Sequence, residues 1–179
     1  WTQPIDSGVV PDTDSKFDVI VVGGGPGGSA SAAYAALAGN RVLLLEKAVY
    51  PRDKTCGDAV GGKSLKHVEE LGVKSMIEKM PHNRVTGIIF SSPNGESIHC
   101  SLPDEEIENK EAGYALPRKE FDYVMFKRAT ELVTQNGGSV IQDFIVTDVN
   151  IDGEGDGEKI IGVTGIIGGK KSGNVPLNF

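Results

Sequence analysis

Three glycines, Gly23, Gly25 and Gly28, form the pattern with the clearest chemical meaning in this sequence, Gly-x-Gly-x-x-Gly. In a dinucleotide-binding turn the first glycine allows a tight turn out of a strand. The second lets the backbone approach a pyrophosphate, and the third lets a helix pack close to the strand. Pro26 fits near the first turn of that helix, whose first N–H groups are free to bind phosphate. The pattern predicts a pyrophosphate site; a glycine-rich turn without a ligand is the alternative.

An acidic residue follows at the spacing of a ribose ligand. Glu46 lies 23 residues after Gly23, at the end of an apolar run over residues 41–46. A carboxylate suits the diol of an adenosine ribose and repels a 2′-phosphate, so NADP is disfavoured at this position. The spacing alone does not separate NAD from FAD. The alternative for Glu46 is an exposed carboxylate at the end of a strand.

The segments around these residues have the order of a βαβ unit. Residues 17–22 form a short run dominated by β-branched side chains, which is typical of a strand buried in a parallel sheet. Residues 29–37 are rich in alanine and predict a helix, which Gly39 would end. Residues 41–46 predict the second strand. All of these segments lie within about thirty residues, the length expected of such a unit.

The rest of the chain predicts further helices, a hairpin and a β-meander. We expect helices over 64–71 and 118–135, hairpin strands over 85–90 and 97–102, a short strand over 114–116, a sheet strand at 140–141, and antiparallel strands over 144–151 and 160–167. The fold class is therefore expected to be α/β, with a parallel sheet flanked by helices, a β-meander and an inserted antiparallel hairpin.

Charge and cysteine content exclude several classes of function. The net charge of −7 argues against a nucleic-acid-binding protein and leaves no polybasic segment for anionic lipid. An apolar lipid substrate stays compatible, because a groove would hold it. The sequence contains no apolar run long enough for a transmembrane helix. Cys56 and Cys100 fit neither a zinc pattern nor a disulfide framework, so we expect reduced thiols, a cytoplasmic location and no metal site.

Three segments resemble the geranylgeranyl reductase family, within the larger group of FAD enzymes that includes p-hydroxybenzoate hydroxylase. They are residues 17–47, the sequence PRDKTCGDAVGG at 51–62, and GYALPRKEFDYVMFKRATE at 113–131. Many flavoproteins share the first segment. Arg-x-Lys-x-Cys-Gly in the second and Arg-x-x-Phe-Asp in the third point to the reductase branch. The resemblance covers about 17–163 and implies a Rossmann-type domain with FAD as its cofactor.

The resemblance also implies roles for individual residues. The expected cofactor-binding residues are Gly23, Gly25, Pro26, Gly27, Gly28, Glu46, Lys47, Arg52, Cys56, Gly57 and Arg118. Arg52 would lie near the FAD phosphates or ribose, and Arg118 would contact FAD from the other side. Cys56, Gly57 and Asp58 would lie near the isoalloxazine ring and the substrate cavity, which makes Cys56 and Asp58 the candidate catalytic residues.

Ordinary structural roles compete with these assignments. Arg52 is alternatively a solvated loop charge, and Arg118 alternatively pairs with Glu120 or Asp122 at the surface. Cys56 is alternatively a small buried residue that fills space. Cys100 lies on a predicted strand and is expected to pack rather than to react.

The expected function is the reduction of isoprenoid double bonds in a small-molecule or lipid substrate. A reduced flavin would donate hydride, and NAD(P)H or ferredoxin would supply electrons. The alternatives are an aromatic hydroxylase or halogenase on the same domain, and a non-catalytic flavin-binding module. Membrane contact would be peripheral.

The domain organisation is expected to be incomplete. We predict a disordered leader over residues 1–16, with an arm packed on the domain as the alternative, and the N-terminal part of an FAD-binding domain over 17–179. A substrate subdomain would start at about 84–113. The family's later Gly-Asp motif and substrate region do not occur in the sequence, so it is expected to be part of a longer protein.

Overall fold

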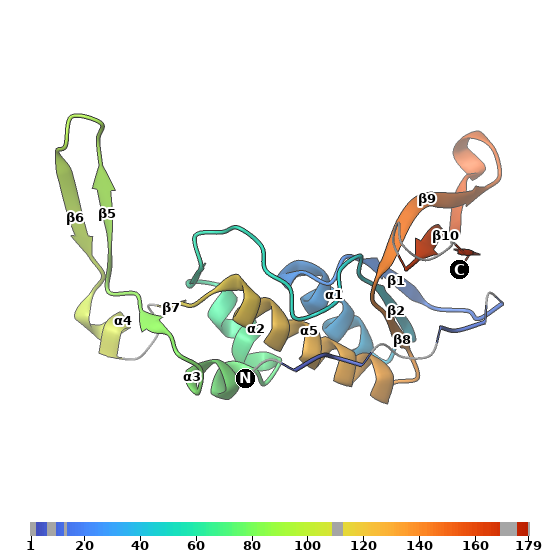
Figure 1. Cartoon of the computed structure of the whole chain (residues 1–179), viewed down its shortest axis with the longest axis horizontal. Helices are drawn as coiled ribbons and strands as arrows, with labels where there is room; N and C mark the ends of the chain where they lie inside the picture. Colours follow the sequence, from blue (N-terminus) through green and yellow to red (C-terminus); the bar gives the residue numbers. More distant parts are fainter. Residues whose placement is uncertain (1–2, 7–9, 13, 109–112, 169–174, 179) are drawn as a thin grey trace. The chain divides into compact units, whose positions relative to one another are not determined.

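The computed structural model describes residues 3–6, 10–12, 14–108, 113–168 and 175–178 (Figure 1). The chain divides into two compact units. The first comprises Trp1–Asp53 and Asp122–Phe179, and the second comprises Lys54–Phe121.

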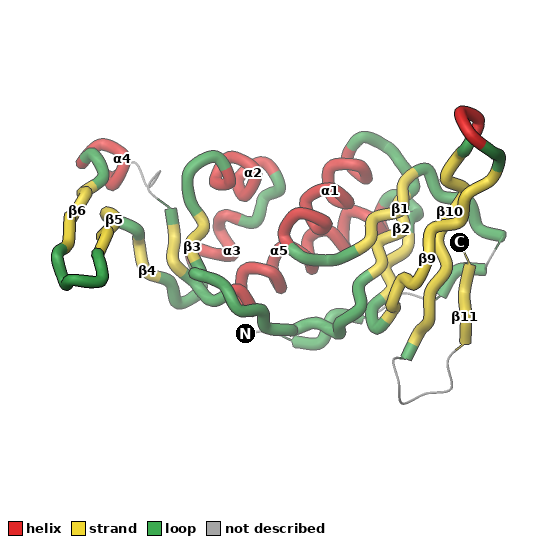
Figure 2. Tube along the Cα trace, turned by 90° about the horizontal axis from the view of Figure 1, so that it is seen from above, coloured by secondary structure: helices red, strands yellow, loops and turns green. Residues whose placement is uncertain are grey.

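The first unit contains the predicted βαβ segment (Figure 2). Strand β1 (Val19–Val22) pairs in parallel with β2 (Val42–Leu45), which pairs in parallel with β8 (Ser139–Ile141). All four side chains of the central strand β2 are buried, as expected of a strand covered on both faces. Helix α1 (Pro26–Leu37) connects β1 to β2. The predicted order of strand, glycine turn, helix and strand is confirmed.

A long helix supplies much of the remaining core. Helix α5 runs over Arg118–Gln135, the bounds predicted from the sequence, and from Asp122 onward it belongs to the first unit. Its side chains Phe126, Ala129 and Val133 are fully buried. Their spacing of three and four residues places them on one face, which accounts for the packing of an otherwise charged helix.

The predicted β-meander is also part of the first unit. Strands β9 (Phe144–Asp152) and β10 (Lys159–Ile167) are antiparallel and are joined by the short 3-10 helix η1 (Gly155–Gly157). Strand β11 (Val175–Asn178), which was not predicted, pairs with the other edge of β10. The meander and the parallel sheet share one apolar cluster, made by Leu43, Leu45, Ile141, Phe144 and Val163.

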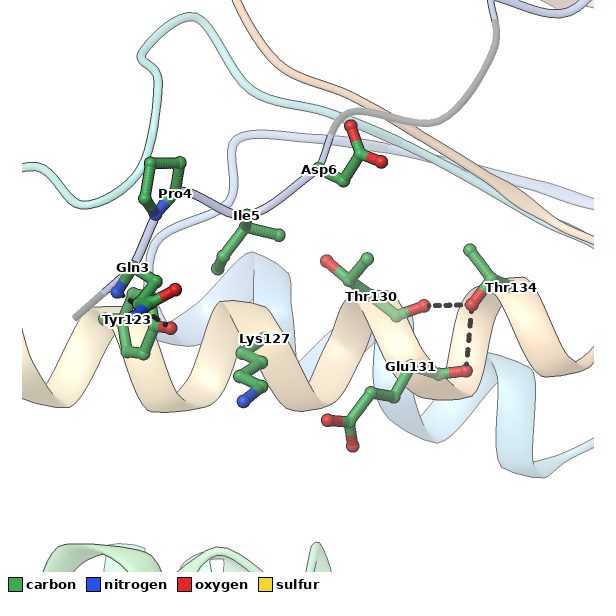
Figure 3. A pocket seen from close by; sticks show the side chains of 9 residues that line it. All are labelled: Gln3, Pro4, Ile5, Asp6, Tyr123, Lys127, Thr130, Glu131 and Thr134. Carbon is green, nitrogen blue, oxygen red and sulfur yellow. Dashed lines mark hydrogen bonds between the residues drawn. The ribbon is translucent and has the colours of Figure 1, made fainter. Parts of the chain in front are cut away.

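Residues 3–6 of the N-terminal segment lie along α5. The Gln3 N–H donates to the Tyr123 hydroxyl at 3.3 Å, and Gln142 Nε2 donates to the Ile5 carbonyl at 2.8 Å. An open groove of about 490 Å³ runs between this segment and the polar face of the helix (Figure 3). Of the leader predicted over 1–16, residues 1–2, 7–9 and 13 lie outside the described residues. The predicted domain boundaries stay a prediction.

The second unit contains a small antiparallel sheet beside two short helices. Strand β7 (Tyr114–Ala115) pairs with β3 (Ala59–Val60) on one side and with β4 (Asn83–Arg84) on the other. Helices α2 (Ser64–Glu70) and α3 (Lys74–Glu78) lie between β3 and β4 in the sequence. The Tyr114 hydroxyl donates to Glu78 Oε1 at 3.0 Å, and burial together with this carboxylate raises the pKa of the Tyr114 phenol.

The predicted hairpin is present in the second unit. Strand β5 (Gly87–Ser91) pairs with β6 (Ser97–Ser101), and helix α4 (Asp104–Glu108) follows. Among the described residues, no helix is both long enough and apolar enough to cross a membrane.

Candidate functional site

The glycine turn between β1 and α1 has a shape that only glycine permits at two positions. Gly23 has a φ of +100°, a left-handed conformation that other residues adopt only with strain, and its N–H donates to the Leu45 carbonyl at 2.7 Å. A Cβ added to Gly28 would overlap the Gly23 carbonyl oxygen. The tight turn and the close approach of the helix are therefore both present, as the spacing predicted.

The start of α1 is suited to an anion. The helix begins at Pro26, its N-cap is Gly25, and its described first turn contains no acidic side chain. Backbone N–H groups in the first turn have no carbonyl partner within their own helix, and the helix dipole makes this end positive. A Cβ at Gly27 would meet no described heavy atom within 4 Å. A pyrophosphate would thus find exposed N–H donors and room for its oxygens.

Glu46, just after the end of β2, forms a hydrogen bond with the same turn. The residue is 4% exposed. Its carboxylate accepts a hydrogen bond from the Gly24 N–H at 2.5 Å and another from the Ala48 N–H at 2.9 Å. The alternative of an exposed strand-end carboxylate is wrong. Each carboxylate oxygen has two lone pairs, so Glu46 can also accept from a ribose hydroxyl.

Aromatic and polar side chains for which the sequence predicted no role also contact the glycine turn. The Gly24 carbonyl accepts from the Tyr50 hydroxyl and from the Ser29 hydroxyl, both at 2.7 Å. Tyr50 stacks on Phe126 with ring centroids 4.2 Å apart. Nothing in the sequence pattern predicts this role for Tyr50 in its loop or for Ser29 in the first helix, because both contacts form only in the folded turn.

Arg52, one of the residues predicted for the cofactor, is a cation beside the turn. Its Nη1 donates to Asp122 Oδ2 at 2.8 Å, its Nε lies 3.9 Å from Glu46 Oε1, and its side chain is 17% exposed. Its Nη2 lies 3.4 Å from the position of a Cβ on Gly25. The alternative of a solvated loop charge is therefore wrong. Lys47 is exposed, and its predicted cofactor contact stays a prediction.

The remaining predicted residues come together in the second unit. Asp58 has a φ of +55°, and its carboxylate accepts from the Arg118 N–H at 3.1 Å. The Asp58 carbonyl accepts from the Leu116 N–H at 2.9 Å. These two hydrogen bonds connect the loop of Cys56, Gly57 and Asp58 to the start of α5 and to the residues just before it. Contact of this group with the flavin ring stays a prediction.

The Cys56 thiol is exposed. A hydrogen bond from the Arg118 side chain and another from the Asp58 backbone N–H lower the pKa of the Cys56 thiol. The alternative that Cys56 is a small buried residue is wrong. Cys100 is exposed as well, so the expectation that it packs inside the protein is also wrong, because both faces of the β5–β6 hairpin are open in its unit.

Replacement of Arg118 by glutamine should raise the pKa of Cys56. The variant removes both the charge and the guanidinium hydrogen bond, and alkylation requires the thiolate. In a Cys100→Ser background, the midpoint of the iodoacetamide rate against pH should move to higher pH. Arg128→Gln is the matched control, because Arg128 lies on the same helix and pairs with Glu131. An unchanged midpoint in Arg118→Gln would show that the guanidinium does not act on the thiol.

Comparison with known proteins identifies the family. Residues 16–151 match the model of the FAD binding domain. The chain is 31% identical over 145 residues to a menaquinone reductase of Mycolicibacterium smegmatis, and 34% identical over 149 residues to a digeranylgeranylglycerophospholipid reductase of Methanocella arvoryzae. Each alignment covers 79% of this chain and, respectively, 32% and 36% of the relative. The chain thus spans about a third of the length of these curated relatives.

Solved structures show the same relationship. A myxobacterial chondrochloren halogenase superimposes with a TM-score of 0.70 at 26% identity, covering 90% of this chain and 35% of that one. A geranylgeranyl bacteriochlorophyll reductase-like protein of Thermoplasma acidophilum superimposes with a TM-score of 0.61, also at 26% identity, covering 90% of this chain and 37% of that one. With its glycine turn, its open helix start and its buried Glu46, the chain belongs to the FAD binding domain family, and FAD is its cofactor.

Proposed function

We propose that the full-length protein is an FAD-dependent reductase that adds hydrogen across the double bonds of an isoprenoid lipid. The observation that carries this proposal is the pairing of the two segments that resemble the reductase branch. Arg52 of the first segment pairs with Asp122 of the second, 70 residues away. Asp58 accepts from Arg118, 60 residues away, and Cys56 contacts the Arg118 side chain. Residues of the segment 51–62 thus form direct contacts with residues of the segment 113–131.

The comparisons support the same class of substrate. A digeranylgeranylglycerophospholipid reductase and a geranylgeranyl bacteriochlorophyll reductase-like protein are among the relatives. The menaquinone reductases are also among them, so menaquinone is the second substrate to test. A lipid substrate would reach a cytoplasmic enzyme through peripheral contact with a membrane.

The roles proposed for this chain's residues follow from their chemistry. FAD, when bound and reduced, supplies the hydride for the alkene. The α1 N-terminus and Glu46 would hold its diphosphate and adenosine ribose. We expect the side chains of Cys56 and Asp58 to shape the substrate cavity. The electron donor is expected to be NAD(P)H or ferredoxin.

Anaerobic reoxidation of the flavin tests the proposal. The full-length protein would be loaded with FAD, reduced with dithionite without oxygen, and mixed with a digeranylgeranyl glycerophospholipid or with menaquinone. Reoxidation of the flavin together with a mass gain of two hydrogens per reduced bond is the expected result. A flavin that stays reduced with both lipids until oxygen enters would contradict the proposal.

A halogenase or hydroxylase is the second candidate. The superposition on the chondrochloren halogenase supports it, because its TM-score of 0.70 is higher than the 0.61 of the reductase-like protein. That function predicts rapid oxygen consumption, driven by NAD(P)H, in the presence of a phenol. Bound flavin that neither lipid nor oxygen reoxidises would instead favour a non-catalytic flavin-binding module.

A further inference from the structure

A buried carboxylate on α5 bonds the arginine that lies beside the glycine turn. Asp122 is fully buried, and it belongs to the same compact unit as the turn. Burial of a carboxylate is unfavourable unless a cation or hydrogen-bond donors compensate for the lost water. The Arg52 guanidinium does so, with Nη1 2.8 Å from Asp122 Oδ2.

The position of the guanidinium has a consequence for ligand binding. Nη2 of Arg52 lies 3.4 Å from where a Cβ of Gly25 would be, and Gly25 is the glycine at which the backbone approaches a pyrophosphate. The guanidinium carbon also lies 5.1 Å from the centroid of the Tyr50 ring. The carboxylate and the ring restrict the guanidinium and keep Nη2 on the side of the turn.

We propose that Asp122 is a positioning residue of the cofactor site: its buried carboxylate holds the Arg52 guanidinium beside Gly25, where that cation binds the diphosphate of FAD. An arginine on a loop would otherwise sample many rotamers, and ordering it on binding would cost free energy. Asp122 orders the side chain before the ligand arrives. This inference concerns the cofactor alone and does not depend on the substrate proposed above.

The charges around Arg52 support this division of roles. Glu46 Oε1 lies 3.9 Å from Arg52 Nε, beyond a hydrogen bond, whereas the contact with Asp122 is a short, charge-assisted one. Neither carboxylate attracts a diphosphate, so the attraction from side chains at this place comes from Arg52. Arg52 therefore has both a structural partner and a charge that the ligand requires.

A double-mutant cycle tests the proposal on the full-length apoprotein. The variants are Asp122→Asn, Arg52→Gln and their combination, and FAD binding is followed by quenching of flavin fluorescence. Replacing a residue that orients a binding side chain typically lowers the affinity by at least about tenfold. Asp122→Asn should therefore raise the Kd for FAD by about that factor. In the Arg52→Gln background, Asp122→Asn should change the Kd by less than about twofold, since the side chain through which it acts is gone.

A series of smaller ligands separates positioning from a general loss of structure. ADP carries the diphosphate and adenosine does not, so Asp122→Asn should weaken ADP about as much as FAD and adenosine by less than about twofold. Equal losses for adenosine and ADP would overturn the proposal, and so would independent, multiplicative effects of the two substitutions on FAD.

A matched variant at Glu131 and the double variant serve as controls for Asp122→Asn. Glu131→Gln removes another α5 carboxylate paired with an arginine, at a half-buried position, and should leave the Kd for FAD unchanged. If Asp122→Asn fails to fold because it leaves Arg52 without its anion, the double variant replaces it. A double variant that binds FAD as Arg52→Gln does supports the proposal, whereas one that binds markedly more weakly contradicts it.

Discussion

Replacement of Gly28 by alanine should lower the free energy of unfolding by about 3 kcal/mol, the upper part of the range for forcing an atom into a packed region. The added Cβ would overlap the Gly23 carbonyl oxygen. That carbonyl has little freedom to move, because it shares a planar peptide unit with the Gly24 N–H, which donates to Glu46, and because the Gly23 N–H is bonded to Leu45 in β2. Helix α1 would have to shift away from β1.

The shift should also disrupt the phosphate site. If the helix start loses its alignment with the turn, the affinity for FAD should fall by roughly 100-fold, equivalent to about 2.7 kcal/mol. Urea unfolding of the apoprotein, followed by circular dichroism, measures the first effect, and fluorescence titration with FAD measures the second.

Gly27→Ala is the matched control for this experiment. Gly27 precedes Gly28 in the same helical turn, and a Cβ there would meet no described heavy atom within 4 Å. Alanine is the better helix former by about 1 kcal/mol, so the apoprotein should be as stable as the parent or slightly more stable. If Gly27→Ala and Gly28→Ala unfold at the same urea concentration, the close approach of α1 to Gly23 is not what the sequence pattern requires.

Replacement of Glu46 by alanine should affect both stability and cofactor binding. The substitution leaves the N–H groups of Gly24 and Ala48 without their carboxylate acceptor. A buried donor without an acceptor costs about 1–3 kcal/mol, so the apoprotein should lose roughly 3 kcal/mol in total. The loss of the ribose acceptor, together with a loosened turn, should raise the Kd for FAD by roughly 100-fold.

Glutamine at position 46 distinguishes the two effects. Glu46→Gln keeps one carbonyl acceptor and nearly the same volume, so it should be destabilised less than Glu46→Ala while still binding FAD more weakly than the parent. Glu131→Ala, which removes a half-buried carboxylate, serves as the control for side-chain truncation. An unfolding free energy that is unchanged in Glu46→Ala would mean that the carboxylate does not brace the turn.

The βαβ unit, the long helix and the meander were predictable because their signals are local. A run of β-branched residues followed at once by Gly23 predicted β1 and its turn, and the bounds of α5 followed from its apolar spacing and from the glycines after Gln135. Helix α1 begins three residues earlier than predicted, at Pro26, because the glycine turn leads directly into its first helical residue.

The two-residue strands β3 and β4 were not predictable. Each is only a pair of residues and exists through its partner β7, with no periodicity of its own. The exposure of Cys100 was missed for a related reason, since the alternation of a strand tells which residues share a face but not whether that face is covered.

The sequence by itself determined the cofactor turn, because glycine is the residue that tolerates the φ of Gly23 and the contact at Gly28, and because a carboxylate at Glu46 suits a ribose. Only the tertiary structure decided that Glu46 is buried against the Gly24 N–H, and that Arg52 is held by Asp122 across 70 residues of sequence. Contacts of this kind depend on how separate segments pack. Local propensity cannot encode them, since each partner alone has the composition of an ordinary charged loop or helix.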